Sequence, residues 1–401
     1  MFKKAAIKKL VNKWKKGSFG VVFWDGDEYD VGEEKPRLKI IFHREPQITD
    51  IKSDVVMTFG EAYMHGVIDF EGSFADVIGT MFENTEAEDD AKFDSLRKHF
   101  HFDEILKEYR AEDRAKEREN IHEHYDLGND FFSQWLDPTM CYSCAYFEHP
   151  TDTLQQAQEQ KIMHTLRKLE LHEGESLLDI GCGWGWLIVK AAEKYRVHAT
   201  GITLSEEQYE GAKKLIHEHG VDGLADVQLM NYMDMDETKW KFDKAVSIGM
   251  LEHVGEKYLP LYLAKVHRLL KDNGLFLLHS IMKEKESTTN SWMTEYIFPG
   301  GYLPVESKMM ALYPEFDFHV VHMESLRRHY AMTLHHWYEN FKKCESDVTK
   351  EYGEEFVRMW GLYLQGCEAA FETGHIDVFQ TLLTKGINND IAMTGDHIYE
   401  R

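Results

Sequence analysis

The clearest chemical motif of the chain is a glycine-rich segment, DIGCGWG, which runs from Asp179 to Gly185. Glycine at alternate positions lets the backbone turn sharply and approach a ligand closely, and the helical stretch that follows offers N–H groups to an anion. The spacing is G-x-G-x-G rather than the dinucleotide pattern G-x-G-x-x-G, and an acid precedes it. We therefore favour S-adenosylmethionine over a nucleotide or a bare turn, with the methionine carboxylate as the anion at the helix end.

The end of the next expected strand carries polar residues but no acid. A dinucleotide site normally has Asp or Glu at this position for the ribose hydroxyls. Here the sequence is GITLS, and Thr203, Ser205 and Gln208 would have to contact the cofactor. Ser205 also suits the N-cap of the following helix, and the two roles are compatible.

These motifs lie where short apolar strands alternate with helical segments, the pattern of a doubly wound, mostly parallel sheet. Its site is expected at the carboxyl ends of the strands. A weaker strand is expected at 316–321, and the segment before it, 283–313, is predicted to be a lid-like insertion. The expected strands are 176–180, 198–203, 227–230, 243–248 and 275–281, and the expected helices are 187–194, 206–218 and 259–270.

The sequence before this region has a different pattern. Short strands at 19–24 and 38–43, separated by Asp25-Gly26-Asp27, give a hairpin-like signal. Helix-like pieces at 59–82, an acidic loop at 86–90 and a highly charged helix at 103–123 follow. We predict a smaller, mostly helical α+β domain over 1–110, for membrane docking or dimerisation, and a catalytic domain over 111–401.

The first 24 residues contain seven lysines and no acid. Ile7, Leu10, Val11 and Trp14 fall at helical spacing among them, so a helix here would have one apolar face. Such a helix suits a membrane interface, and it suits equally an ordinary helix that packs on its own domain. The sequence leaves both interpretations open.

Composition excludes several classes of protein. With 46 Lys+Arg against 70 Asp+Glu, the formal charge of −24 argues against nucleic-acid binding. No stretch has the roughly 18 apolar residues of a membrane span, and no secretory signal is recognisable. Five cysteines are few and odd in number for 401 residues, which favours a reducing cytoplasm. No H-E-x-x-H or comparable spacing indicates a metal, and Cys141 and Cys144, although spaced C-x-x-C, have no second pair or His cluster for zinc.

Five phrases of the sequence closely resemble the cyclopropane-fatty-acyl-phospholipid synthases. The resemblance runs from about Gly60 to about Tyr338, in the family's order and spacing. The phrases are HYDLGNDFF (124–132), YSCAY (142–146), LDIGCGWG (178–185), SIGMLEHVG (247–255) and FPGG (298–301).

The resemblance implies a Rossmann-like methyltransferase domain with a seven-stranded sheet. It also implies an enzyme that inserts a methylene from S-adenosylmethionine across a cis double bond of a phospholipid acyl chain. A bound bicarbonate ion is expected to take a proton from the intermediate carbocation so that the ring closes. The implied setting is the inner face of the cell membrane, where a cytoplasmic, peripherally bound homodimer would act.

Matching the family's motifs residue by residue gives an expected site. The implied bicarbonate ligands are Cys144, Glu252, His279, the backbone of Ile281, and Tyr330. The implied S-adenosylmethionine contacts are Tyr125, Tyr142, Ser143, Gly181, Gly183, Thr203 and Gln208, with the adenine near Tyr232 and Met233. The sequence departs from the family here, because Asn231-Tyr232-Met233-Asp234 stands where many members have Asp-Tyr-Arg-Asp. This departure weakens the adenine assignment more than the assignment of the chemistry.

Two rival functions remain compatible with the sequence. Related enzymes methylate amines, or methylate alkenes without closing a ring. A non-catalytic lipid-binding protein with a degenerate cofactor fold is the second rival, against which the intact glycine motif and the complete ligand set argue.

Overall fold

In the computed structural model, the chain forms two compact units. One consists of Met1–Ala91, Glu286–Pro299 and Leu334–His375, and the other of Lys92–Lys285, Gly300–Thr333 and Ile376–Arg401. The structure describes residues 2–12, 18–32, 35–36, 38–46, 55–74, 76–77, 127–286 and 290–399. The expected boundary near residue 110, the acidic loop, the charged helix and Tyr125 lie outside these ranges.

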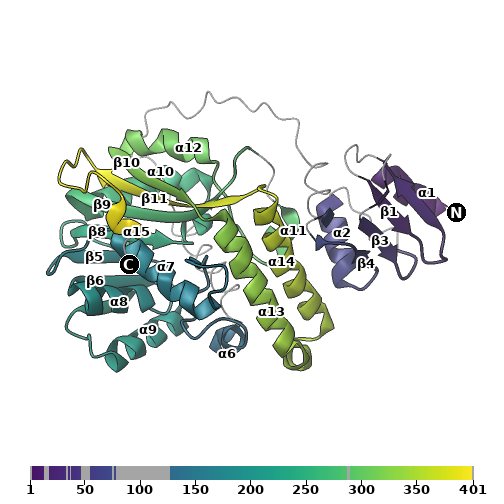
Figure 1. Ribbon diagram of the computed structural model, residues 1–401, viewed down its shortest axis with the longest axis horizontal. Helices are drawn as coiled ribbons and strands as arrows, with labels where there is room; N and C mark the ends of the chain where they lie inside the picture. Colours follow the sequence, from purple (N-terminus) through teal and green to yellow (C-terminus); the bar gives the residue numbers. More distant parts are fainter. Residues whose placement is uncertain are drawn as a thin grey trace. The chain divides into compact units, whose positions relative to one another are not determined.

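The larger unit is built on a seven-stranded sheet of order β10-β11-β9-β8-β5-β6-β7 (Figure 1). Strands β9, β8, β5, β6 and β7 are mutually parallel, whereas β11 runs antiparallel to both β9 and β10. The prediction of a mostly parallel, doubly wound sheet is therefore confirmed. The strands are β5 (Ser176–Ile180), β6 (His198–Thr203), β7 (Ala225–Leu229), β8 (Phe242–Ile248), β9 (Leu270–Met282), β10 (Phe318–Ser325) and β11 (Asp377–Lys385).

Helices cover both faces of this sheet (Figure 1). Neighbouring residues of a strand point to opposite faces, so Leu177 packs with α7, α8 and α9, whereas Leu178 packs with α10 and α12. The helices of this unit are α6 (Gly128–Ser133), α7 (Leu154–Lys168), α8 (Trp186–Tyr195), α9 (Glu206–Glu218), α10 (Leu259–Leu269), α12 (Glu306–Leu312) and α15 (Asp396–Tyr399).

The other unit contains a four-stranded sheet of order β2-β1-β3-β4. The turn at Asp25-Gly26 joins β1 to β2, a strand that the sequence did not predict, and β3 lies parallel to β1. Within this unit, Trp292 of α11 donates to Met64 Sδ of α2 at 3.0 Å, so part of the predicted lid packs on α2. The elements are α1 (Phe2–Val11), β1 (Phe19–Val22), β2 (Glu28–Val31), β3 (Leu38–Phe42), α2 (Val55–Met64), β4 (Ile68–Glu71), α11 (Ser291–Tyr296), α13 (Arg327–Tyr352) from Leu334 onward, and α14 (Glu354–Glu372).

The N-terminal helix α1 uses its apolar face inside its own unit. Ile7 and Val11 are buried in the core of the four-stranded sheet. Lys4 is ion-paired with Asp25 and Asp27. Of the two interpretations that the sequence left open, packing on its own domain is the one seen for these residues. In the described part of the chain, no helix is long and apolar enough to cross a membrane.

The turn from β5 to α8 depends on Gly185, which has a φ of +87°. A Cβ added there would lie 2.9 Å from Ala212 Cβ of α9, so this glycine also allows α8 and α9 to approach closely. Gly220, after α9, has a φ of +66° and open space around it. It offers a matched control in which only the backbone conformation is strained.

We predict that Gly185→Ala lowers the free energy of unfolding by about 2 kcal/mol more than Gly220→Ala does, since both strain the backbone but only the first overpacks a helix contact. Urea unfolding of the two variants and the wild type measures the difference. Equal losses of unfolding free energy in the two variants would show that the added methyl group fits between α8 and α9 without cost.

Candidate active site

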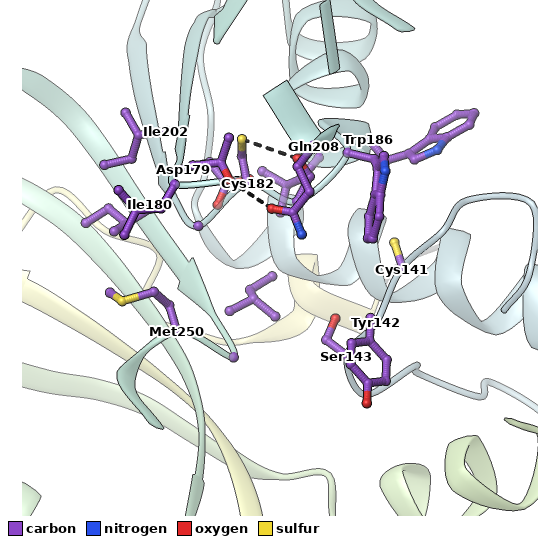
Figure 2. A pocket seen from close by; sticks show the side chains of 18 of the residues that line it. Cys141, Tyr142, Ser143, Asp179, Ile180, Cys182, Trp186, Ile202, Gln208 and Met250 are labelled. Atoms are coloured by element: carbon purple, nitrogen blue, oxygen red, sulfur yellow. Dashed lines mark hydrogen bonds between the residues drawn. The ribbon is translucent and has the colours of Figure 1, made fainter. Parts of the chain in front are cut away.

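A pocket opens at the carboxyl ends of β5, β6 and β8, beside the loop that leads from α6 to α7 (Figure 2). In Figure 2, Tyr142 and Ser143 face it from the side opposite Met250. Met233 is buried in the core and does not line it. The structure brings seven of the expected cofactor contacts together here: Tyr142, Ser143, Gly181, Gly183, Thr203, Gln208 and Tyr232.

The end of β6 presents an oriented amide to this pocket. Thr203 Oγ1 donates to Gln208 Oε1 at 2.8 Å, which leaves the NH₂ group of Gln208 as a donor. Ser205 accepts from the Gln208 backbone N–H at 3.3 Å and so caps α9, as its position in the sequence indicated. The two roles expected for this segment are thus divided between neighbouring side chains.

The sequence analysis missed two buried polar residues of α7, of which Lys161 lines the pocket and Gln158 holds a loop beside it. Lys161 is only 3% exposed, and its Nζ donates to Ser143 Oγ at 3.0 Å. Gln158 donates to the backbone oxygen of Ser143 at 2.9 Å and so holds the loop that carries Tyr142. Both share the buried face of α7 with Ile162. A polar residue at the spacing of an apolar helix face was the signal that could have found them.

Asp179 places a buried carboxyl in the same pocket. Burial raises the pKa of Asp179 to about 7, although the nearby charge of Lys161 opposes this shift. A cationic ligand bound there would favour the ionised carboxylate. The pocket therefore combines an acid, a lysine and amide donors, which suits a zwitterionic amino-acid group that also carries a positive sulfonium.

A second group of buried polar atoms lies next to this pocket. Glu252 stands in a one-turn 3₁₀ helix, Leu251–His253, between the pocket residues Met250 and His253. Its Oε1 accepts from the backbone N–H of Ile281 in β9 at 2.7 Å. Its Oε2 and the Nε2 of His279, two residues earlier on β9, are both buried and have no hydrogen-bond partner within 3.5 Å among the described residues, although the Ser280 side chain lies near enough to Glu252 to lower its pKa. Because an unpaired buried polar atom is costly, a polar ligand that contacts these two atoms would offset that cost.

Backbone contacts connect Cys144 and Tyr330 to the segment of β9 that carries His279 and Ile281. The Leu326 backbone oxygen accepts from the Tyr330 N–H at 2.9 Å and lies 3.8 Å from Cys144 Sγ. Leu326 in turn donates to the oxygen of Val378, which pairs with Ile281 across β11 and β9. All five residues expected to hold an anion are therefore linked through this part of the sheet.

Burial sets the protonation states of this group. It raises the pKa of the Cys144 thiol, raises that of Glu252 to about 7 and lowers that of His279 to about 3. At neutral pH Cys144 is a thiol, His279 is a neutral imidazole, and Glu252 can either donate or accept a proton. Within the described residues, no group of three or more His, Cys, Asp or Glu side chains could hold a metal ion.

A glycine turn that opens into such a pocket, on a seven-stranded sheet with antiparallel β11, defines an S-adenosylmethionine-dependent methyltransferase. The family model described as mycolic acid cyclopropane synthetase matches residues 112–381, and the chain belongs to this family. A model described as a domain of unknown function matches residues 6–90.

The chain is similar over most of its length to known proteins. A "Probable fatty acid methyltransferase" of Pseudomonas putida is 37% identical over 386 residues, which cover 94% of this chain and 95% of that protein. The "Cyclopropane-fatty-acyl-phospholipid synthase" of Escherichia coli K12 is 40% identical over 272 residues, 68% of this chain and 69% of that protein. The crystal structure of mycolic acid cyclopropane synthase CmaA1 with SAH and CTAB has a TM-score of 0.63 and 36% identity, and the match covers 67% of this chain and 98% of that one.

The raised pKa of Glu252 predicts a change in how stability depends on pH. A carboxyl that binds its proton more tightly in the folded state lowers the free energy of unfolding as pH rises from its unfolded pKa toward about 7. Between pH 5 and pH 8 we expect the free energy of unfolding of the wild type to fall by about 2 to 3 kcal/mol more than that of Glu252→Gln, whose side chain cannot ionise.

Urea unfolding at both pH values measures this difference. Asp236→Asn is the matched control, because the pKa of that exposed carboxyl is about 2 and it is ionised throughout this range. A Glu252→Gln profile parallel to the wild type would contradict the assignment.

Proposed function

We propose that the protein transfers a methylene from S-adenosylmethionine across a cis double bond of an unsaturated phospholipid acyl chain. The observation that carries this proposal is the pair of buried, unpartnered atoms, Glu252 Oε2 and His279 Nε2, beside the cofactor pocket. An amine acceptor attacks through its own lone pair and needs at most a base that removes an ammonium proton, whereas an alkene acceptor leaves a carbocation that must lose a proton from its new methyl group before a ring can close. The name of the Escherichia coli relative supports a phospholipid as the acceptor.

The chemistry explains why a second site is needed. The alkene attacks the methyl group, the carbon–sulfur bond breaks, and S-adenosylhomocysteine and a carbocation result. An alkene is a weak nucleophile, so alignment with the sulfonium in a water-free site must supply much of the rate. One proton must then leave the new methyl group so that the ring can close.

The residues around the unpartnered atoms fit a bicarbonate ion, which when bound would supply the base for that proton. His279 and a protonated Glu252 can donate to its oxygens. The resemblance implies the Cys144 thiol and the Tyr330 hydroxyl as further donors, and the one thiol hydrogen would then have to leave the backbone oxygens of Ala145 and Leu326 that it faces. The Ile281 N–H is already bonded to Glu252, so it can contribute only if it is shared between them. Glu252, with a pKa of about 7, is suited to pass a proton at neutral pH.

The decisive test is incubation of the protein with S-adenosylmethionine and vesicles of cis-monounsaturated phospholipid, followed by mass spectrometry of the released fatty acids. We expect a gain of one CH₂, about 14 Da, with loss of the alkene signal and the appearance of cyclopropane proton resonances. The same mass gain without those resonances would favour methylation without ring closure, the second candidate, which the name of the Pseudomonas putida relative supports. No mass gain with cofactor binding intact would redirect the search to amine acceptors.

In the same assay, we expect Glu252→Gln to abolish lipid turnover and to leave S-adenosylhomocysteine affinity within a few-fold of wild type. Glu256→Gln is the matched control, because Glu256 is exposed and pairs with Lys308 at 2.6 Å. Comparable turnover by both variants would remove Glu252 from the mechanism.

We further propose that the enzyme works as a peripherally bound homodimer on the cytoplasmic face of the membrane. The location of a phospholipid substrate supports membrane contact. Because Ile7 and Val11 are buried, we expect helix α1 to contribute charge rather than an inserted apolar face. Co-sedimentation with anionic vesicles should therefore weaken as salt increases, and binding that is insensitive to salt would contradict this. Light scattering tests the dimer.

A further inference from the structure

A chain of buried hydrogen bonds leads from His279 away from the cofactor pocket. Gln380 of β11 lies directly opposite His279 of β9, and its Nε2 is 3.2 Å from His279 Nδ1. On its other side, Gln380 Oε1 is 2.7 Å from Lys168 Nζ of α7. The three side chains are at most 2% exposed, so water does not compete for these bonds.

The chemistry of the partners fixes which way the Gln380 amide faces. An ammonium group has only donors, so the amide oxygen must point to Lys168 and the NH₂ group to the other side. There, Thr165 Oγ1 lies 3.2 Å from Nε2 and donates its own proton to the Lys161 backbone oxygen. Thr165 therefore accepts one amide hydrogen, and the remaining one is directed to His279.

Lys168 is held in place by a carboxylate. Glu324 Oε2 lies 2.6 Å from Lys168 Nζ and 2.7 Å from His164 Nε2. Burial lowers the pKa of Lys168, and the adjacent Glu324 charge opposes this and favours the ammonium form. Glu324 thus holds Lys168, and Lys168 in turn sets the orientation of the Gln380 amide that contacts His279.

Since Nδ1 of His279 accepts a hydrogen bond, the proton of the neutral ring must be on Nε2. We propose that Lys168 and Gln380 are positioning residues that fix His279 in its Nε2–H form, so that it presents a buried donor to the oxygen of the ligand held with Glu252. This inference rests on the proposed function for the identity of that ligand. The alternative is that the chain only ties β11 to α7.

The tautomer can be read directly by long-range ¹H–¹⁵N NMR of the full-length protein labelled with ¹⁵N-histidine, without lipid or bicarbonate. The His279 signals are those absent from His279→Gln. We expect a protonated Nε2 and an unprotonated Nδ1 in the wild type. A wild-type ring protonated at Nδ1 would overturn the proposal without reference to any variant or to the reaction.

Two variants distinguish a role of Gln380 in positioning His279 from a purely structural role in tying β11 to α7. Gln380→Met removes the donor at similar volume, and we expect a mixture of tautomers with a 10- to 100-fold lower kcat and an unchanged KM for S-adenosylmethionine. Thr165→Val is the matched control, because it removes the other hydrogen bond of the same amide. It should keep the Nε2–H form and a kcat within a few-fold of wild type.

Equal losses of kcat in the two variants, or an Nε2–H tautomer in Gln380→Met, would show a purely structural role. Should Gln380→Met not fold, Gln380→Glu takes its place: a carboxylate faces Nδ1 and should draw a proton there, and an unprotonated Nδ1 would contradict the proposal. If the wild type is in the Nε2–H form but forms no cyclopropane, the proposed function fails while the assignment of the tautomer stands.

Discussion

The pairing of β11 with β9 is the constraint on which the second polar site depends. This register sets Gln380 opposite His279 and Val378 opposite Ile281. Val378 then binds Leu326, the residue that precedes α13 and whose oxygen meets both Cys144 and Tyr330. A shift of one residue would turn every side chain of β11 to the other face and break each of these links. The site is therefore defined by strand register as much as by its residues.

Several charged side chains of the larger unit are buried, and burying a charge costs free energy of folding unless the charge is paired. Lys161, Lys168, Asp179 and Glu252 are each at most 9% exposed, and they are among several buried charged side chains of this unit, which also include Asp137, Lys244 and Lys265. Lys168 is compensated by Glu324 and Gln380, whereas Glu252 keeps an oxygen without a partner. Replacing compensated pairs with apolar residues is often neutral or stabilising in proteins, so stability alone does not account for them. An unpartnered buried polar atom needs an explanation, and a ligand bound at that atom is one.

Local patterns predicted the sheet unit well. The bounds of β5, β6 and α9 agree with the expected ranges, because strand alternation, the glycine turn and the Ser205 cap are all encoded by neighbouring residues. Strand β11 was not predicted, since it pairs with β9, about 100 residues earlier, and short patterns carry no trace of such pairing. Gln380 and Lys168 were missed for the same reason: each has its role only in contact with the other. The expected anion ligands came from the resemblance to a family, because no spacing in the sequence reveals them.

The late position of β11 in the sequence also bears on synthesis. A ribosome releases β5 to β9 well before residues 377–385, so for part of translation the edge of β9 has no partner. That edge includes Leu275, Leu277 and Leu278, which are fully buried in the finished protein. An open apolar edge is a template for association with other chains. The nine residues of β11 therefore both cover this edge and bring Gln380 beside His279, so the two changes occur together.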